Sequence, residues 1–170
     1  IMKAAAEKFT PVTLELGGKS PVVVTPSANE AKTVNRVWTG KTMNAGQTCI
    51  APDYVLMQAD KKPAFIAQST AWLDAHYPNL ADNPDYSFVI NPKQASRVQG
   101  YLDEAKQRGA TLIPLTDYAV NIETGFFPPI IVTDVPSDAK LLTEEIFAPV
   151  LPLVPYQDLA QAVAYVNERD

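Results

Sequence analysis

The one cysteine of this 170-residue chain, Cys49, stands in the run Asn44-Ala45-Gly46-Gln47-Thr48-Cys49-Ile50-Ala51-Pro52. Small and turn-forming residues precede the thiol, whereas a cysteine used only for packing behaves as a small hydrophobe among apolar neighbours. A glycine in such a turn lets the backbone approach a substrate closely. The pattern is compatible both with a cysteine nucleophile and with a buried structural thiol.

Glu15 is a second group that could do chemistry. It stands in Val12-Thr13-Leu14-Glu15-Leu16-Gly17-Gly18-Lys19-Ser20-Pro21, where apolar and polar residues alternate. The alternation predicts a short strand from Thr13 to Leu16 that ends at the Gly17-Gly18 turn. In open α/β sheets ligands bind beyond the carboxyl ends of strands, so we expect Glu15 to line such a crevice. The alternative is a solvated glutamate on a half-exposed strand.

The elements that must position these groups alternate along the chain. Strands are expected at Thr13 to Leu16, Pro21 to Thr25, Tyr54 to Gln58, Thr111 to Pro114, Pro128 to Thr133 and Leu151 to Pro155. Helices are expected at Ala28 to Met43, Lys61 to His76, Pro92 to Arg108 and Asp158 to Glu168. This order predicts an α/β fold, a mainly parallel twisted sheet with helices on both faces. The loops between these elements are too short to divide the chain into two domains.

Three segments, taken together and in this order, resemble the aldehyde dehydrogenase superfamily. They are Leu14-Glu15-Leu16-Gly17-Gly18-Lys19-Ser20-Pro21, the Asn44 to Cys49 run, and Thr143-Glu144-Glu145-Ile146-Phe147-Ala148-Pro149-Val150. The stretch from Gln47 to Leu56 is most similar to the class 3 and coniferyl aldehyde dehydrogenase branch. The resemblance implies an NAD(P)-dependent enzyme that oxidises a small-molecule aldehyde, aromatic aldehydes included.

In the chemistry that the resemblance implies, the Cys49 thiolate attacks the aldehyde carbonyl to give a thiohemiacetal. Hydride then leaves to NAD or NADP, and a water deprotonated by Glu15 hydrolyses the thioester. The backbone N–H of Cys49 would supply one oxyanion donor.

By the same resemblance Glu145 would bind the nicotinamide ribose hydroxyls and Phe147 would pack near the nicotinamide ring. Ala148 stands where the family usually has glycine, which would be costly if that position required a positive φ. The alternative for this segment is the end of a helical turn before Pro149, with Phe147 in the core.

The resemblance also predicts the domain organisation. Residues 1–170 are expected to be a catalytic (thiol) domain truncated at both ends, with the cofactor-binding and oligomerisation segments absent. The dinucleotide would then be bound mainly by the missing domain, and the full-length protein would be a homodimer or a higher homo-oligomer. The isolated segment is expected to lack dehydrogenase activity, although weak ester hydrolysis could survive.

Composition excludes several function classes. A net charge of −5 with 14 scattered Lys and Arg argues against nucleic-acid binding, and no apolar run is long enough for a membrane span in this segment. One cysteine cannot form an internal disulfide, which favours a cytoplasmic protein. His76 is the only histidine and has no partner at ligand spacing, so we predict no metal site.

Two other function classes stay open on the residues alone. Cys49, Glu15 and the nearby Lys19 are the nucleophile, base and cation that a cysteine hydrolase or amidase requires. A binding module without catalysis is the third class. Saturable NAD(P)+ binding would favour the dehydrogenase over both.

Overall fold

The computed structural model describes residues 1–169, which form an α/β fold around one five-stranded sheet. The strands are β1 (Pro21–Val23), β2 (Tyr54–Met57), β3 (Thr111–Pro114), β4 (Ile130–Thr133) and β5 (Val150–Pro155). Their order across the sheet is β1-β2-β5-β4-β3. The first four in that order are parallel to one another, and β3 runs antiparallel to β4. The predicted fold class is confirmed.

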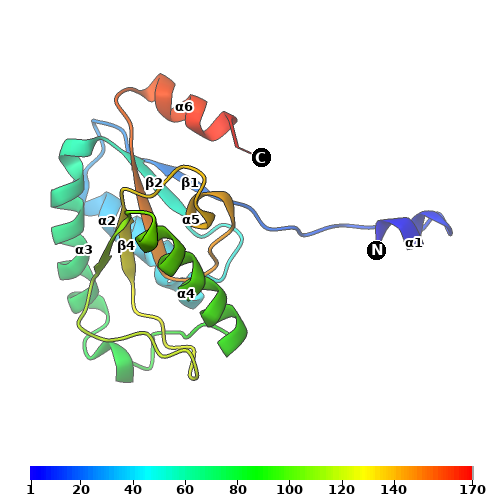
Figure 1. The fold of residues 1–170 in the computed structure, drawn as a ribbon, viewed down its shortest axis with the longest axis horizontal. Coiled ribbons are helices and arrows are strands. Elements are labelled where there is room, and N and C mark those ends of the chain that lie inside the picture. Colours follow the sequence, from blue (N-terminus) through cyan, green and yellow to red (C-terminus); the bar gives the residue numbers. More distant parts are fainter. Residues whose placement is uncertain (170) are drawn as a thin grey trace.

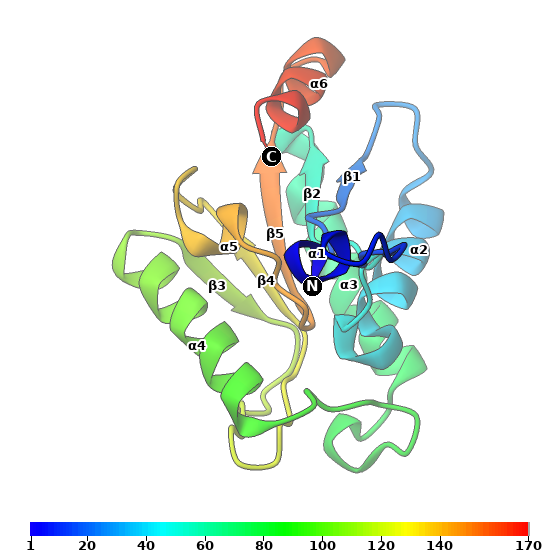
Figure 2. The same ribbon diagram turned by 90° about the vertical axis from the view of Figure 1, so that its right-hand side faces the viewer.

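Helices cover both faces of this sheet (Figure 2). The helices of the described residues are α1 (Met2–Ala6), α2 (Glu30–Thr42), α3 (Lys62–His76), α4 (Pro92–Gln107), α5 (Lys140–Thr143) and α6 (Leu159–Asn167), with short 3₁₀ turns η1 (Met43–Gly46), η2 (Ala59–Lys61) and η3 (Leu80–Asp82). α1 lies at the end of an arm, away from the sheet (Figure 1). α2 and α3 lie on one face and α4 on the other. No helix in the described residues is both long and apolar enough to cross a bilayer.

Successive strand residues belong to two different hydrophobic cores, because neighbouring side chains in a strand point to opposite faces of the sheet. Val55 and Met57 of β2 belong to the cluster that contains Trp38 of α2 and Phe65 of α3. Ile130 and Val132 of β4, with Val150 of β5, belong to the cluster under α4. β2, β4 and most of β5 are buried on both faces, which explains why these central strands read as continuous apolar runs, whereas the edge strands β1 and β3 are only partly buried.

Side-chain caps explain why three helices begin within two residues of their predicted starts. Asn29, Asn91 and Asp158 accept hydrogen bonds from the backbone N–H groups of Lys32, Gln94 and Gln161, at 3.0, 2.9 and 2.8 Å. Each bond satisfies one of the unpaired N–H groups at a helix start. β4 begins two residues later than predicted, at Ile130, because Pro128 and Pro129 have no N–H for the strand ladder.

The predicted strand from Thr13 to Leu16 is wrong. Residues 10–20 have no regular secondary structure, and Figure 1 shows them as an extended arm that joins α1 to the body of the protein. A strand needs a neighbour for its backbone hydrogen bonds, and no described strand pairs with this segment. Its alternating apolar side chains are consequently exposed, with Leu16 at 84%.

Candidate functional site

The three segments that carry the candidate residues all precede strands. Ser20 is followed by β1, Asp53 by β2, and Pro149 by β5. Because β1, β2 and β5 are parallel and adjacent in the sheet, their starts share one edge. The candidate site therefore lies at the amino-terminal edge of the sheet, not beyond the carboxyl ends where we expected Glu15.

Cys49 is exposed at this edge. The turn before it is left-handed over three successive residues, with φ of 51° at Asn44, 55° at Ala45 and 72° at Gly46. The hydroxyl of Ser20 donates to the carbonyl of Cys49 at 3.1 Å. This bond joins the Cys49 segment to Ser20, the residue after Lys19. It uses the backbone carbonyl of Cys49, so the exposed thiol stays free of it.

Gln47 connects this turn to the loop before α4. Its amide nitrogen donates to the carbonyls of Asn44 and Phe88 at 2.9 and 3.1 Å. Its amide oxygen accepts from the N–H of Ile90 at 2.8 Å. Sequence reasoning did not assign Gln47 a role, because the partner loop lies 41 residues away.

Gly46 has no room for a side chain. A Cβ there would lie 2.8 Å from the carbonyl oxygen of Ala148 and 3.0 Å from that of Lys41, at a φ of +72°. We expect Gly46→Ala to lower the free energy of unfolding by about 1–3 kcal/mol, because strain and overlap add. Urea denaturation of the full-length protein measures this. Gly100→Ala, in α4 with open space around it, is the control and should raise stability by up to about 1 kcal/mol. Equal effects of the two substitutions would contradict the close approach.

The buried carboxylate of Asp53 is the contact point between the segments. Its Oδ2 lies 2.6 Å from Nζ of Lys19, and its Oδ1 accepts from the N–H of Ile146 at 3.1 Å. Nζ of Lys41 lies 3.7 Å from Oδ1. The N–H of Asp53 donates to the carbonyl of Ser20 at 2.9 Å. Asp53 thus contacts three parts of the chain: the segment before β1, the segment before β5 and the end of α2.

The two lysines at Asp53 differ in the hydrogen bonds that their ammonium groups make. Lys19 also donates to the carbonyls of Leu141 and Glu144, at 2.8 and 2.9 Å. Burial lowers the pKa of Lys19, and the charge and hydrogen bond of Asp53 oppose that shift. Lys41 is fully buried, and its ammonium makes no hydrogen bond with any described residue. Burial lowers the pKa of Lys41 to about 8, against the opposing charge of Asp53.

Sequence reasoning missed Asp53 and Lys41, although one signal was present. Lys41 follows Val34, Val37 and Trp38 at helical spacing, so it falls on the buried face of α2. A lysine at a core position requires a buried counter-charge, and Asp53 comes immediately before a fully buried strand.

Glu145 and Phe147 lie on a turn held by Arg97 of α4. The guanidinium donates to the carbonyls of Glu145 and Ile146 at 3.1 and 2.7 Å. The carboxylate of Glu145 accepts from the N–H of Gly18 at 3.2 Å. Phe147 is 36% exposed, so the alternative that placed it in the core is wrong.

The positive φ in this turn is at Phe147, at 56°, and Ala148 is not among the described residues with positive φ. Alanine in place of glycine at position 148 therefore costs no backbone strain. Ala148 is fully buried, where a small side chain fits.

Glu15 lies on the arm and is exposed. It precedes Gly18 by three residues, and Gly18 is bonded to Glu145. The structure therefore brings the base of the Glu15 segment to the same edge as Cys49 and Glu145. No hydrogen bond of the Glu15 carboxylate occurs among the described residues.

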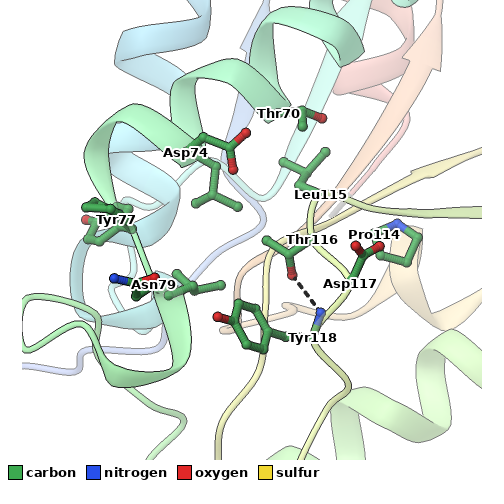
Figure 3. Close-up of a pocket in the computed structure, with 12 residues that line it drawn as sticks. Thr70, Asp74, Tyr77, Asn79, Pro114, Leu115, Thr116, Asp117 and Tyr118 are labelled. Carbon is green, nitrogen blue, oxygen red and sulfur yellow. Dashed lines mark hydrogen bonds between the residues drawn. The ribbon is translucent and has the colours of Figure 1, made fainter.

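Two surface hollows differ in their relation to this edge. A groove of about 470 Å³ is lined by Gln47, Gln94, Arg97, Glu145 and Phe147, among others, and so adjoins the Cys49 turn. A groove of about 670 Å³ lies between the end of α3 and the loop after β3, as Figure 3 shows. None of the candidate site residues lines it, so the first groove is the one that belongs to the candidate site.

The chain resembles known proteins over its whole length. Residues 1–170 match the aldehyde dehydrogenase family. A probable coniferyl aldehyde dehydrogenase of Pseudomonas aeruginosa is 47% identical over 169 residues, which are 99% of this chain and 35% of that protein. Substrate-bound AldH of Staphylococcus aureus is 36% identical with a TM-score of 0.89, covering 99% of this chain and 36% of that one. A betaine aldehyde dehydrogenase of Staphylococcus aureus in complex with NAD+ is 26% identical with a TM-score of 0.82, covering 99% and 34%.

The chain therefore belongs to the aldehyde dehydrogenase family, and its similarity to a coniferyl aldehyde dehydrogenase confirms the predicted resemblance to that branch. It spans about a third of the length of these relatives.

Proposed function

We propose that the full-length protein oxidises an aldehyde to the carboxylic acid and transfers the hydride to NAD+ or NADP+. The observation that carries this proposal is the convergence of the Cys49, Gly18 and Glu145 segments at one edge of the sheet, through the bonds from Ser20 to Cys49 and from Gly18 to Glu145. The bond from Gly18 to Glu145 joins segments that are 127 residues apart in the sequence.

In this mechanism the Cys49 thiolate attacks the carbonyl carbon, and the backbone N–H of Cys49 donates to the oxyanion that forms. Loss of hydride leaves a thioester on Cys49. Glu15 removes a proton from the water that attacks this thioester, which releases the acid and restores the thiol. Glu15 lies on the arm whose base is held at the site, so we infer that it reaches the thioester from there.

The groove beside Cys49 fits the nicotinamide end of a dinucleotide, which when bound accepts the hydride. Glu145 presents a carboxylate that can accept hydrogen bonds from ribose hydroxyls. The 36% exposed ring of Phe147 offers an apolar face beside it. We propose that most of the remaining cofactor contacts are made by residues outside these 170, in an additional cofactor-binding domain.

An aromatic aldehyde is the proposed substrate class, supported by the 47% identity to a probable coniferyl aldehyde dehydrogenase. A homodimer or larger homo-oligomer is the proposed assembly of the full-length protein, on the family resemblance alone.

The three contacts of the Lys19 ammonium argue against a cysteine hydrolase or amidase. Lys19 is engaged by Asp53 and by the carbonyls of Leu141 and Glu144. Its three N–H donors are therefore all used, and none is free to polarise a substrate. The hydrolase hypothesis loses the cation it needs.

The test is oxidation of benzaldehyde and coniferyl aldehyde by the full-length protein. NAD(P)H fluorescence follows reduction of the cofactor, and chromatography follows the acid. We expect saturable, equimolar formation of NAD(P)H and acid, and loss of both after alkylation of the thiol with iodoacetamide. Ester hydrolysis without cofactor reduction would support the hydrolase, and saturable cofactor binding without turnover would support a binding module.

A further inference from the structure

We propose that Asp53 is a positioning residue whose buried carboxylate holds the nucleophile segment, the Glu15 segment and the Glu145–Phe147 turn in register, with Lys19 and Lys41 as its two counter-charges. The inference rests on the proposed function for its kinetic consequences, but the geometry it describes can be tested without turnover.

The first step is connectivity. Three residues separate Asp53 from Cys49. The N–H of Ala51 donates to the carbonyl of Thr48 at 3.0 Å, which closes a turn around Cys49. Pro52, directly before Asp53, has a restricted φ. The link is therefore stiff. The contacts that hold the Asp53 carboxylate therefore also fix the position of Cys49.

The second step is that the anchors lie on the other two segments. Lys19 follows the Gly17-Gly18 turn, and its 2.6 Å contact to Asp53 is the shortest bond between the Glu15 segment and the β2 start. Ile146 stands between Glu145 and Phe147, and its N–H is bonded only to this carboxylate among the described residues. Loss of the carboxylate would leave that buried N–H unpaired and free the turn to move.

The third step is the charge of the cluster. Two lysines face one buried carboxylate, and the further carboxylate that acts on them, Glu145, is only half-buried, so the buried cluster has an excess of positive charge while Lys41 is protonated. Within residues 1–169, Lys41 makes no hydrogen bond that would offset the cost of its own burial. A buried charge of this kind is a weak source of stability, and replacement by an apolar side chain of similar size is often neutral or stabilising. Replacing Lys41 therefore changes the charge that faces Asp53 while the protein stays folded.

Lys41 also makes the stability of the folded protein depend on pH. The titratable groups that face it are Asp53 before β2, Lys19 before β1 and Glu145 before β5. The pKa of Lys41 is about 8 in the folded protein and about 10.5 when exposed. Between these values the unfolded state binds more protons, so stability contributed by this group rises with pH across that window and is constant below it.

The first experiment replaces the carboxylate in the full-length enzyme. Asp53→Asn keeps the shape and leaves two lysines without a counter-charge. Its single amide oxygen can accept well from Lys19 or from the N–H of Ile146 but not from both, so one of the two anchors is lost. We expect kcat to fall and KM for NAD(P)+ to rise, each at least fivefold. Hydrogen exchange should accelerate at least tenfold in peptides that cover residues 17–20 and 144–148. Asp117→Asn, at an exposed aspartate with no hydrogen bond among the described residues, is the matched control and should change none of these.

The second experiment removes the unpaired charge. We expect Lys41→Met to fold with at least wild-type stability at pH 7 and to lose the rise in stability between about pH 8 and 10.5. Added to Asp53→Asn, it should recover at least threefold of the lost kcat/KM, because one uncompensated charge is gone. Lys106→Met, on the exposed surface of α4, is the control for the loss of a lysine.

Three results would overturn the proposal: unchanged exchange in both peptides of Asp53→Asn, no recovery in the double variant, or an unaltered pH slope in Lys41→Met. If Asp53→Asn does not fold, the hydrogen-exchange measurement is made on the double variant Asp53→Asn/Lys41→Met, in which one of the two buried lysine charges is also removed. Absence of aldehyde oxidation by the wild-type protein would refute the proposed function, whereas the exchange and pH measurements would still decide the role of Asp53.

Discussion

Cys49→Ala in the full-length protein is expected to lower kcat for aldehyde oxidation by about 10⁴-fold or more, because no other described group can form the thiohemiacetal. Cys49 is the only cysteine of these 170 residues. It is also exposed, so the substitution should leave the free energy of unfolding within about 0.5 kcal/mol of the wild-type value. Initial rates with saturating aldehyde and cofactor, together with urea denaturation, measure both quantities.

Binding of NAD(P)+ is the internal control for this substitution. Glu145 and Phe147 are untouched, so the dissociation constant measured by fluorescence titration should change less than threefold. Retention of more than about 1% of the wild-type kcat would mean that Cys49 is not the nucleophile. A loss of activity that comes with a loss of cofactor binding would instead indicate damage to the turn at Gly46.

Glu15→Gln is expected to separate the two halves of the reaction. Formation of the thioester and the first equivalent of NAD(P)H should persist as a burst, because neither step needs the carboxylate. Steady-state turnover should fall by about 10²- to 10⁴-fold, the usual range for loss of a general base. Stopped-flow fluorescence at enzyme concentrations comparable to the substrate resolves burst from steady state.

Glu7→Gln is the matched control, since Glu7 is an exposed glutamate close to the same arm. It should behave as the wild-type protein. Equal slowing of burst and steady state by Glu15→Gln would show that Glu15 activates Cys49 rather than the hydrolytic water. No slowing of either would remove Glu15 from the mechanism.

Local chemistry in the sequence was sufficient to predict most elements. Asn29, Asn91 and Asp158 are side chains that cap helices, and the helices begin directly after them. The apolar runs of β2 and β5 are buried on both faces, as expected for a parallel sheet. Such signals act over a few residues, so they can be read without knowing the fold.

The errors arose where a prediction needed a partner outside its own segment. The alternation around Glu15 is typical of a strand, but no described strand pairs with it. Ala148 was suspected of strain because glycine is usual there, whereas the left-handed residue is its neighbour Phe147, held by Arg97 from α4.

The sequence by itself was sufficient to predict the α/β class and to select the candidate chemical groups, since residue type and short spacing carry both signals. Only the tertiary structure decided that the site lies at the amino-terminal edge, because this depends on β2 and β5 being neighbours although helices and two further strands separate them in sequence. The cluster of Lys19, Lys41 and Asp53 was likewise found only in the tertiary structure. Asp53 pairs with Lys19 from 34 residues away and with Ile146 from 93 residues away, and no local pattern encodes which distant charge will neutralise a buried one.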